Sequence, residues 1–163
     1  MKFNIDKMNA SEQIAKHLHE VYFGGNWTTT NLQKVLSDVN WKEATNKIQD
    51  FNTIATLAYH VNYFSKTVSE FLEGKPFNSK DALSFIHPLI NSEKDWNQLI
   101  VVILQDGKRF SELIAQLPEE KLDQSFVDEK YGIYYRNLHG IIEHIHYHLG
   151  QMVIIKKLIR NNA

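Results

Sequence analysis

The 163-residue sequence contains no cysteine, which excludes disulfide bonds, zinc sites built from thiolates and a cysteine nucleophile. It has only three prolines and seven glycines, so helix breakers are few. It also lacks an excess of charge of either sign, because 18 lysines and arginines stand against 19 acids, a net charge of −1. Because the chain has no excess of positive charge, neither nucleic acid nor an anionic membrane surface is expected as a partner.

Long apolar runs are missing as well. No stretch approaches the roughly 18 consecutive apolar residues of a membrane span, and the first eight residues lack the apolar core of a signal peptide. We therefore expect a cytoplasmic protein. The hydrophobic fraction of 43% and the aromatic fraction of 12% are those of a globular protein, and the length suits one domain over residues 1–163.

Residues 137–159 carry the most information, because they hold half of the histidines. In a strand, His144, His146 and His148 would share one face. In a helix, His144 and His148 lie one turn apart and His146 points away. Apolar residues recur there at steps of three, four and seven, and the run is far longer than a usual strand of about 5–6 residues. The sequence therefore predicts a helix with His144 and His148 turned inward and with His139 and His146 on the solvated side.

Similar periodicity predicts three more long amphipathic helices, over residues 9–23, from Asp50 or Asn52 to Glu73, and from Ser92 to Pro118. Short helices are expected at the capping box Thr30–Gln33 and over residues 81–86. Residues 122–135 are a long connection with room for a small extended hairpin. Four long helices without a convincing set of strands predict an all-α four-helix bundle with short extra helices in its connections.

His60 lies in the middle of the inward row of the second long helix, where it can meet His144 and His148. Bundle cores are common places for metal sites built from facing helices. Three neutral imidazoles suit zinc, nickel, copper or iron and leave one coordination position open, as in catalytic zinc sites. Water in that position would have its pKa lowered towards ~7. The alternative is that the three histidines simply pack and form hydrogen bonds.

Several other residues are candidates for a structural or a functional role. Gly107 interrupts the third long helix, either as a weak point or as a place of close helix approach. Tyr63 either packs or reaches the metal cavity as a proton donor. Three histidines are expected at the surface or only partly packed: His17, His19 and His87. Three tryptophans are expected in the core or in a dimer interface: Trp27, Trp41 and Trp96.

A family resemblance rests on two stretches. The pattern His144-x-x-x-His148-x-Gly150-Gln151, together with His60 within Thr-Leu-Ala-Tyr-His-Val-Asn-Tyr, resembles the DinB/YfiT-like superfamily. The Gly25-Asn26-Trp27 stretch is similar to one branch of it. The resemblance implies an up-down-down-up four-helix bundle, often dimeric, in which the three histidines hold zinc or nickel. It also implies a supporting role for Gln151 rather than that of a ligand.

Members of that superfamily transfer low-molecular-weight thiols to electrophiles, catalyse thiol-dependent isomerisation or are described as metal-dependent hydrolases, so the resemblance does not select a reaction. Because the chain has no cysteine, a thiol would be a diffusible cosubstrate. We expect a homodimeric, metal-dependent enzyme of the thiol S-transferase or hydrolase type with a small-molecule substrate. The alternative is a non-catalytic, stress-related protein that binds a metal or a small ligand, because no carboxylate pair converges on the histidines.

Overall fold

The structure is a computed structural model that describes residues 8–161. Of the first eight residues, which were compared above with a signal peptide, seven therefore lie outside the described residues. Within residues 8–161 the chain forms α-helices and short turns but no β-strand, as the all-α prediction required. The helices are α1 (Ala10–Phe23), α2 (Leu32–Ser37), α3 (Trp41–Thr45), α4 (Ile54–Leu72), α5 (Asp81–Ser84), α6 (Glu93–Ala115) and α7 (Tyr134–Asn161). None of them combines the length and the apolarity that a membrane crossing needs.

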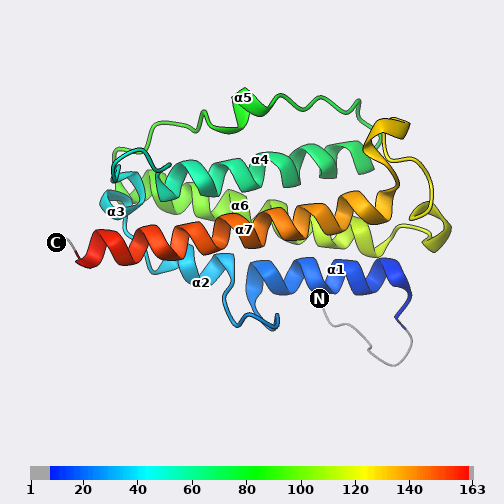
Figure 1. The fold of residues 1–163 in the computed structure, drawn as a ribbon, viewed down its shortest axis with the longest axis horizontal. Helices are drawn as coiled ribbons and strands as arrows, with labels where there is room; N and C mark the ends of the chain where they lie inside the picture. Colours follow the sequence, from blue (N-terminus) through cyan, green and yellow to red (C-terminus); the bar gives the residue numbers. More distant parts are fainter. Residues whose placement is uncertain (1–7, 162–163) are drawn as a thin grey trace.

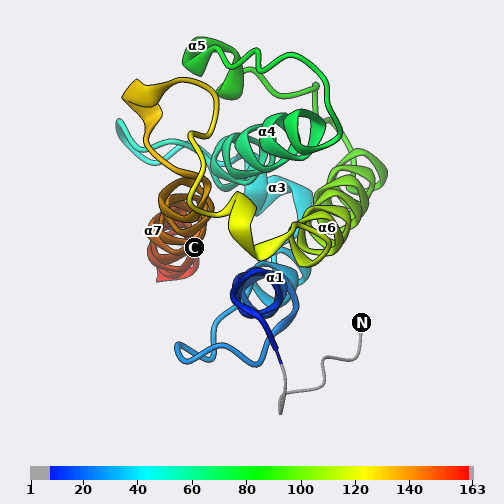
Figure 2. The ribbon, with the colours of Figure 1, turned by 90° about the vertical axis from the view of Figure 1, so that its right-hand side faces the viewer.

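The four longest helices lie side by side (Figure 1). Seen end-on, they form a ring in which α1 and α4 each contact both α6 and α7 (Figure 2). Helices α1 and α7 run in one direction, and α4 and α6 run in the other. Because α4 and α6 are consecutive long helices that run in the same direction, the connection over residues 73–92, which includes α5, passes back along the length of α4.

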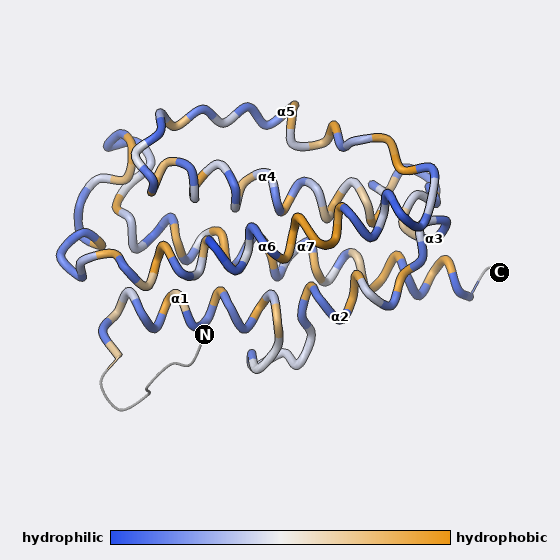
Figure 3. The backbone as a smooth tube through the Cα atoms, turned by 180° about the vertical axis from the view of Figure 1, so that it is seen from behind, coloured by the Kyte–Doolittle hydropathy of each residue, from blue (hydrophilic) through white to orange (hydrophobic). Residues whose placement is uncertain are grey.

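Apolar and polar residues alternate along the long helices with the helical period (Figure 3), which gives each helix one apolar side. These sides meet in a continuous core that includes Leu18, Val61, Ile103, Phe110 and Ile145, each fully buried.

Gly107 of α6 lets α1 approach closely. The ring of Tyr22 lies against this glycine, and a Cβ atom built there would overlap the ring. The hydroxyl of Tyr22 is 2.9 Å from Oγ of Ser65 on α4, so one buried side chain of α1 contacts both α4 and α6. Of the two interpretations of Gly107, the close approach is confirmed.

The predicted starts of two helices were wrong. Helix α2 is capped by Asn31 rather than Thr30, because the Asn31 side chain accepts a hydrogen bond from the backbone N–H three residues later. Helix α4 is capped by Thr53, whose Oγ1 plays the same part, and neither Asp50 nor Asn52 does so. In both cases several good capping residues stand next to one another, and packing selects among them.

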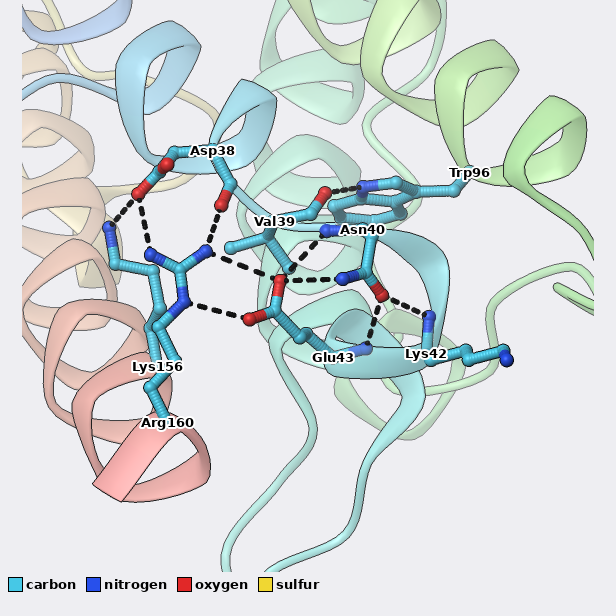
Figure 4. A network of polar contacts seen from close by, with 8 residues as sticks. All are labelled: Asp38, Val39, Asn40, Lys42, Glu43, Trp96, Lys156 and Arg160. Atoms are coloured by element: carbon cyan, nitrogen blue, oxygen red, sulfur yellow. Dashed lines mark hydrogen bonds and ion pairs between the residues drawn. The ribbon is translucent and has the colours of Figure 1, made fainter. Parts of the chain in front are cut away.

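Helix α3 forms at a place for which no helix was predicted. Asn40 caps it by accepting hydrogen bonds from two backbone N–H groups, each at 3.0 Å. Near the end of α7, Arg160 binds the carboxylates of Asp38 and Glu43, at 3.1 and 2.7 Å (Figure 4). These contacts attach the C-terminal end of α7 to the segment that joins α2 and α3.

The connection between α6 and α7 holds two 3₁₀ turns, Glu119–Lys121 and Glu129–Tyr131. The extended hairpin expected here is reduced to a single antiparallel bridge between Ser125 and Ile133. Aromatic rings replace strand pairing, since Phe126 packs edge-on against both Phe71 and Tyr134. This cluster positions the start of α7.

Candidate metal centre

Three histidine rings converge between α4 and α7. Nε2 of His144 lies 3.0 Å from Nε2 of His60 and 3.0 Å from Nε2 of His148. The three residues form a group whose possible ligand atoms all lie within 4.8 Å of one another. His60 and His148 are only 4% and 8% exposed, and His144 is partly buried. The three positions singled out from the sequence therefore meet at one point.

The orientation of His148 is set by Gln151. Nδ1 of His148 lies 2.7 Å from Oε1 of Gln151, three residues further along α7. An amide oxygen only accepts hydrogen bonds, so Nδ1 carries the proton and donates it. The remaining nitrogen, Nε2, then presents its lone pair to the centre. Gln151 thus holds the ring of His148 from the side away from His144.

His60 is oriented in the same manner by a residue of α5. Its Nδ1 lies 2.7 Å from Oγ of Ser84. The single hydroxyl hydrogen of Ser84 is donated to the backbone oxygen of Asp81, at 2.5 Å. Oγ therefore accepts from Nδ1–H of His60, and the Nε2 lone pair of His60 also points at His144.

His144 faces two lone pairs but cannot satisfy both. A neutral imidazole has one proton at most, so Nε2–H of His144 can donate to only one of the two nitrogens. A cation bound by all three Nε2 atoms would satisfy every lone pair at once. For zinc with nitrogen ligands at ~2.0–2.1 Å in tetrahedral geometry, the nitrogens are about 3.3 Å apart, close to the 3.0 Å that separates Nε2 of His144 from Nε2 of each of the other two rings. Three imidazole nitrogens suit several divalent metals, among them zinc, nickel, copper and iron.

The protonation states favour the same role. Burial, with His148 and His60 close by, lowers the pKa of His144 to about 4. Burial and the nearby His148 also lower the pKa of His60. Both rings are therefore neutral at neutral pH, which is the form that binds a metal.

Aromatic side chains surround the three rings. Phe85 stacks on His60 with ring centroids 4.2 Å apart, and Phe64 meets His60 and His144 edge-on at 5.0 and 5.2 Å. Tyr147 meets the ring of His148 edge-on at 4.9 Å. Phe85 and Tyr147 are exposed. The centre is therefore bordered by apolar surface that solvent reaches.

Of the two alternatives for Tyr63, the one in which it reaches the metal cavity is wrong. Its hydroxyl accepts a hydrogen bond from the backbone N–H of Lys80 at 2.9 Å. Tyr63 lines a cavity on an adjoining face of α4, and the wall of that cavity contains none of the three histidines. Glu143, next to His144 in the chain, is exposed and does not belong to the histidine group.

The expectation that His139 and His146 are solvated is also wrong. Both are partly buried, and the ring of His146 lies 6.1 Å from that of His17 on α1. Burial lowers the pKa of both residues, and the nearby His17 lowers it further. The reason is that α1 packs along this side of α7, which local periodicity does not reveal. His19 is partly buried beside Phe23, and His87 lies beside Tyr59.

The three tryptophans differ in environment. Trp96 is fully buried and donates from Nε1 to the backbone oxygen of Val39 at 2.7 Å (Figure 4). Trp41 is partly buried. Trp27 is 99% exposed, so a core role is excluded for it, and a role in a dimer interface stays a prediction.

Ser84 and Phe85 were missed from the sequence. A helical turn over residues 81–86 was predicted, and α5 confirms it. Nothing in the local pattern, however, indicates that the connection passes back across α4 and lies over His60. The one sequence feature that bears on this path is the length of the connection between two long helices that run in the same direction.

Comparisons with family models, with curated proteins and with solved structures find no match to this chain, so the candidate centre rests on the geometry above.

Proposed function

We propose that the protein is a metal-dependent enzyme in which His60, His144 and His148 bind one divalent cation, zinc or nickel. The observation that carries this proposal is the convergence of three Nε2 atoms, two of which are directed by hydrogen bonds from Nδ1 to Ser84 and Gln151. Hydrogen-bonded imidazoles of this kind are the usual support of metal sites.

Membership of the DinB/YfiT-like superfamily is part of the proposal. The directions of the four long helices support an up-down-down-up four-helix bundle. The contact from Gln151 to His148 supports the role that the resemblance gives to that glutamine. A cytoplasmic homodimer without nucleic-acid or membrane partners completes the proposal, and the net charge of −1 supports the last two points.

The chemistry proposed for the centre is activation of a small thiol or of water. A divalent cation held by three neutral imidazoles lowers the pKa of a thiol or water that coordinates beside them. The chain contributes by keeping His144 and His60 deprotonated and by holding two of the rings in place. Phe64 and Phe85 cover parts of the rings and limit the access of water. A thiol would come from a diffusible cosubstrate, because the chain has no cysteine.

One observation favours a second candidate, a non-catalytic, stress-related protein that binds a metal or a small ligand. Among residues 8–161, the hydrogen bonds of the three rings go to Ser84, Gln151 and each other. No carboxylate stands ready as a general acid or base in that set. The two candidates are distinguished by whether the metal-loaded protein turns over a substrate.

Metal binding is tested on protein purified without a nickel column. We expect the wild type to bind about one zinc or nickel ion per chain, measured by elemental analysis after dialysis and by calorimetric titration. His144→Ala should lose this ion. The matched control is His146→Ala, two residues away on the same helix and off the centre, which should retain it. Equal metal content in the wild type and in His144→Ala would contradict the proposed site.

The reaction is tested with chloro- or epoxide-bearing acceptors, with and without a small thiol. A thiol transferase should need both the metal and the thiol, and His144→Ala should be inactive. Equal turnover without thiol would rule out the transferase and favour a hydrolase. Bound metal with no turnover across acceptors would favour the non-catalytic candidate.

A further inference from the structure

A second candidate site lies away from the histidines. A cavity of about 510 Å³ opens between α4, α6 and the connection over residues 73–92. Its volume lies within the range of small-molecule sites, roughly 300–1,000 Å³. Its α4 wall includes Tyr59, Asn62 and Tyr63, and none of the three histidines lines it. An occupant would therefore bind independently of the metal centre.

Asn62 lines this cavity and has a buried side-chain oxygen that receives no hydrogen bond from the described residues. The residue is only 5% exposed, and its Oδ1 has no hydrogen-bond partner among the described residues. Its Nδ2 donates to Oδ2 of Asp106 on α6, at 2.9 Å. Turning the amide over would set its oxygen against a carboxylate, so Oδ1 stays the unpaired atom. A buried acceptor left unpaired costs free energy, which a ligand that donates a hydrogen bond would recover.

The charges around the cavity favour a cationic donor. Two carboxylates line it, those of Glu70 and Asp95, together with the exposed ammonium of Lys66, and a second ammonium, that of Lys75, pairs with Glu70 at 3.2 Å. The carboxylate of Asp106 lies directly behind Asn62. The rings of Tyr59 and Tyr63 add faces that attract a positive charge. An anionic ligand would meet repulsion here.

The other side of the cavity is apolar. Leu99 and Val102 of α6 and Ile90 of the connection supply aliphatic surface. Ile90 is buried, whereas Val102 is 39% exposed at the edge. A ligand that fits both sides carries a polar, hydrogen-bond-donating nitrogen at one end and an apolar body at the other.

We propose that this cavity binds a small amphipathic amine, whose protonated nitrogen donates to Oδ1 of Asn62 and whose apolar body rests on Leu99 and Val102. Oδ1 of Asn62 is buried in the free protein, so the Asn62 side chain would turn towards the cavity when the amine binds. The site is distinct from the proposed metal centre and does not depend on it.

The first test is calorimetric titration of the full chain with 2-phenylethylamine and with phenylacetate, two probes of similar shape and opposite charge. Both are run in the His144→Ala variant with a chelator present, so that metal binding plays no part. We expect the amine to bind at least tenfold more tightly than the carboxylate. Equal affinity, or no binding of the amine, overturns the proposal whatever the metal centre does.

Variants then locate the amine. Val102→Trp should fill the cavity from α6 and weaken amine binding at least tenfold. The matched control is Val101→Trp, the neighbouring exposed valine that does not line the cavity, which should leave binding unchanged. Asn62→Leu should also weaken amine binding at least tenfold, with thermal unfolding used to verify the fold. Unchanged binding in a folded Asn62→Leu or Val102→Trp protein overturns the assignment of this cavity.

Discussion

Nδ1 of His148 donates a hydrogen bond to Oε1 of Gln151 at 2.7 Å, and this contact turns the other ring nitrogen towards His144. Ser84 does the same for His60 from a different helix. The two supports come from opposite sides, one from α7 itself and one from α5. Together they hold two lone pairs on a common point before any ion binds.

Replacing Gln151 by leucine removes the acceptor for Nδ1 of His148. We expect zinc affinity to fall roughly 10- to 100-fold, as is typical when a hydrogen bond behind a metal-ligating histidine is lost. Gln151→Glu keeps an acceptor and should bind at least as well as the wild type. Affinity is measured by competition with a chromophoric chelator. Wild-type affinity in Gln151→Leu would show that this contact does not orient the ring.

Replacing Ser84 by alanine leaves the buried Nδ1–H of His60 without a partner. An unpaired buried donor costs about 1–3 kcal/mol, so the metal-free protein should lose that much stability in urea unfolding. Zinc affinity should fall as well. The control is Ser37→Ala, an exposed serine at the end of α2, for which both quantities should stay near wild type. A neutral effect of Ser84→Ala would contradict the role given to α5.

Two glycines in long helices should respond in opposite ways to alanine. Gly107→Ala places a Cβ against the ring of Tyr22 and should destabilise the protein by about 1–3 kcal/mol or more, as overpacking does. Gly150 is exposed in α7 with no atom within 4 Å of a Cβ, so Gly150→Ala should stabilise by roughly 0.5–1 kcal/mol. Thermal and urea unfolding measure both, and the same sign for the two would contradict the packing described.

The stability of the metal-free protein should depend on the protonation of His144. The pKa of this ring is about 4 in the folded chain against 6.5 for an ordinary histidine. Between these values the unfolded chain binds more protons, so the free energy of unfolding falls as the pH is lowered from 6.5 to about 4. Above pH 6.5 the contribution is fully present.

The size of this effect for His144 alone should be on the order of 2 kcal/mol, because the ring keeps some contact with solvent. His60, His139 and His146 also have lowered pKa values and act in the same direction. His144→Asn isolates one contribution, since its stability should fall less steeply over this range. Parallel pH profiles for the wild type and the variant would contradict the lowered pKa of His144.

Local patterns were sufficient to predict the long helices and the histidine pair. The period of apolar residues over residues 137–159 places His144 and His148 on one face, and α7 confirms it. The row through His60 likewise depends on positions within one helix. Helical periodicity is a property of consecutive residues, so it can be read without knowledge of the neighbours.

The predictions were wrong where contacts between segments distant in the sequence determine the structure. Asn31 rather than Thr30 caps α2, because adjacent residues compete and the tertiary structure selects one. His146 is covered by α1, a helix about 130 residues earlier in the chain, and Ser84 reaches His60 only because the connection passes back along α4. Contacts of this kind depend on how helices pack and on which way connections run, and residue spacing does not encode either.

The most direct measurement of the central claim is zinc K-edge X-ray absorption of the protein loaded with one equivalent of zinc. We predict a first shell that contains three imidazole nitrogens at about 2.0–2.1 Å, lost in His144→Ala and unchanged in His146→Ala. A shell of oxygen atoms only, or a nitrogen shell that persists in His144→Ala, would contradict a metal centre built from His60, His144 and His148.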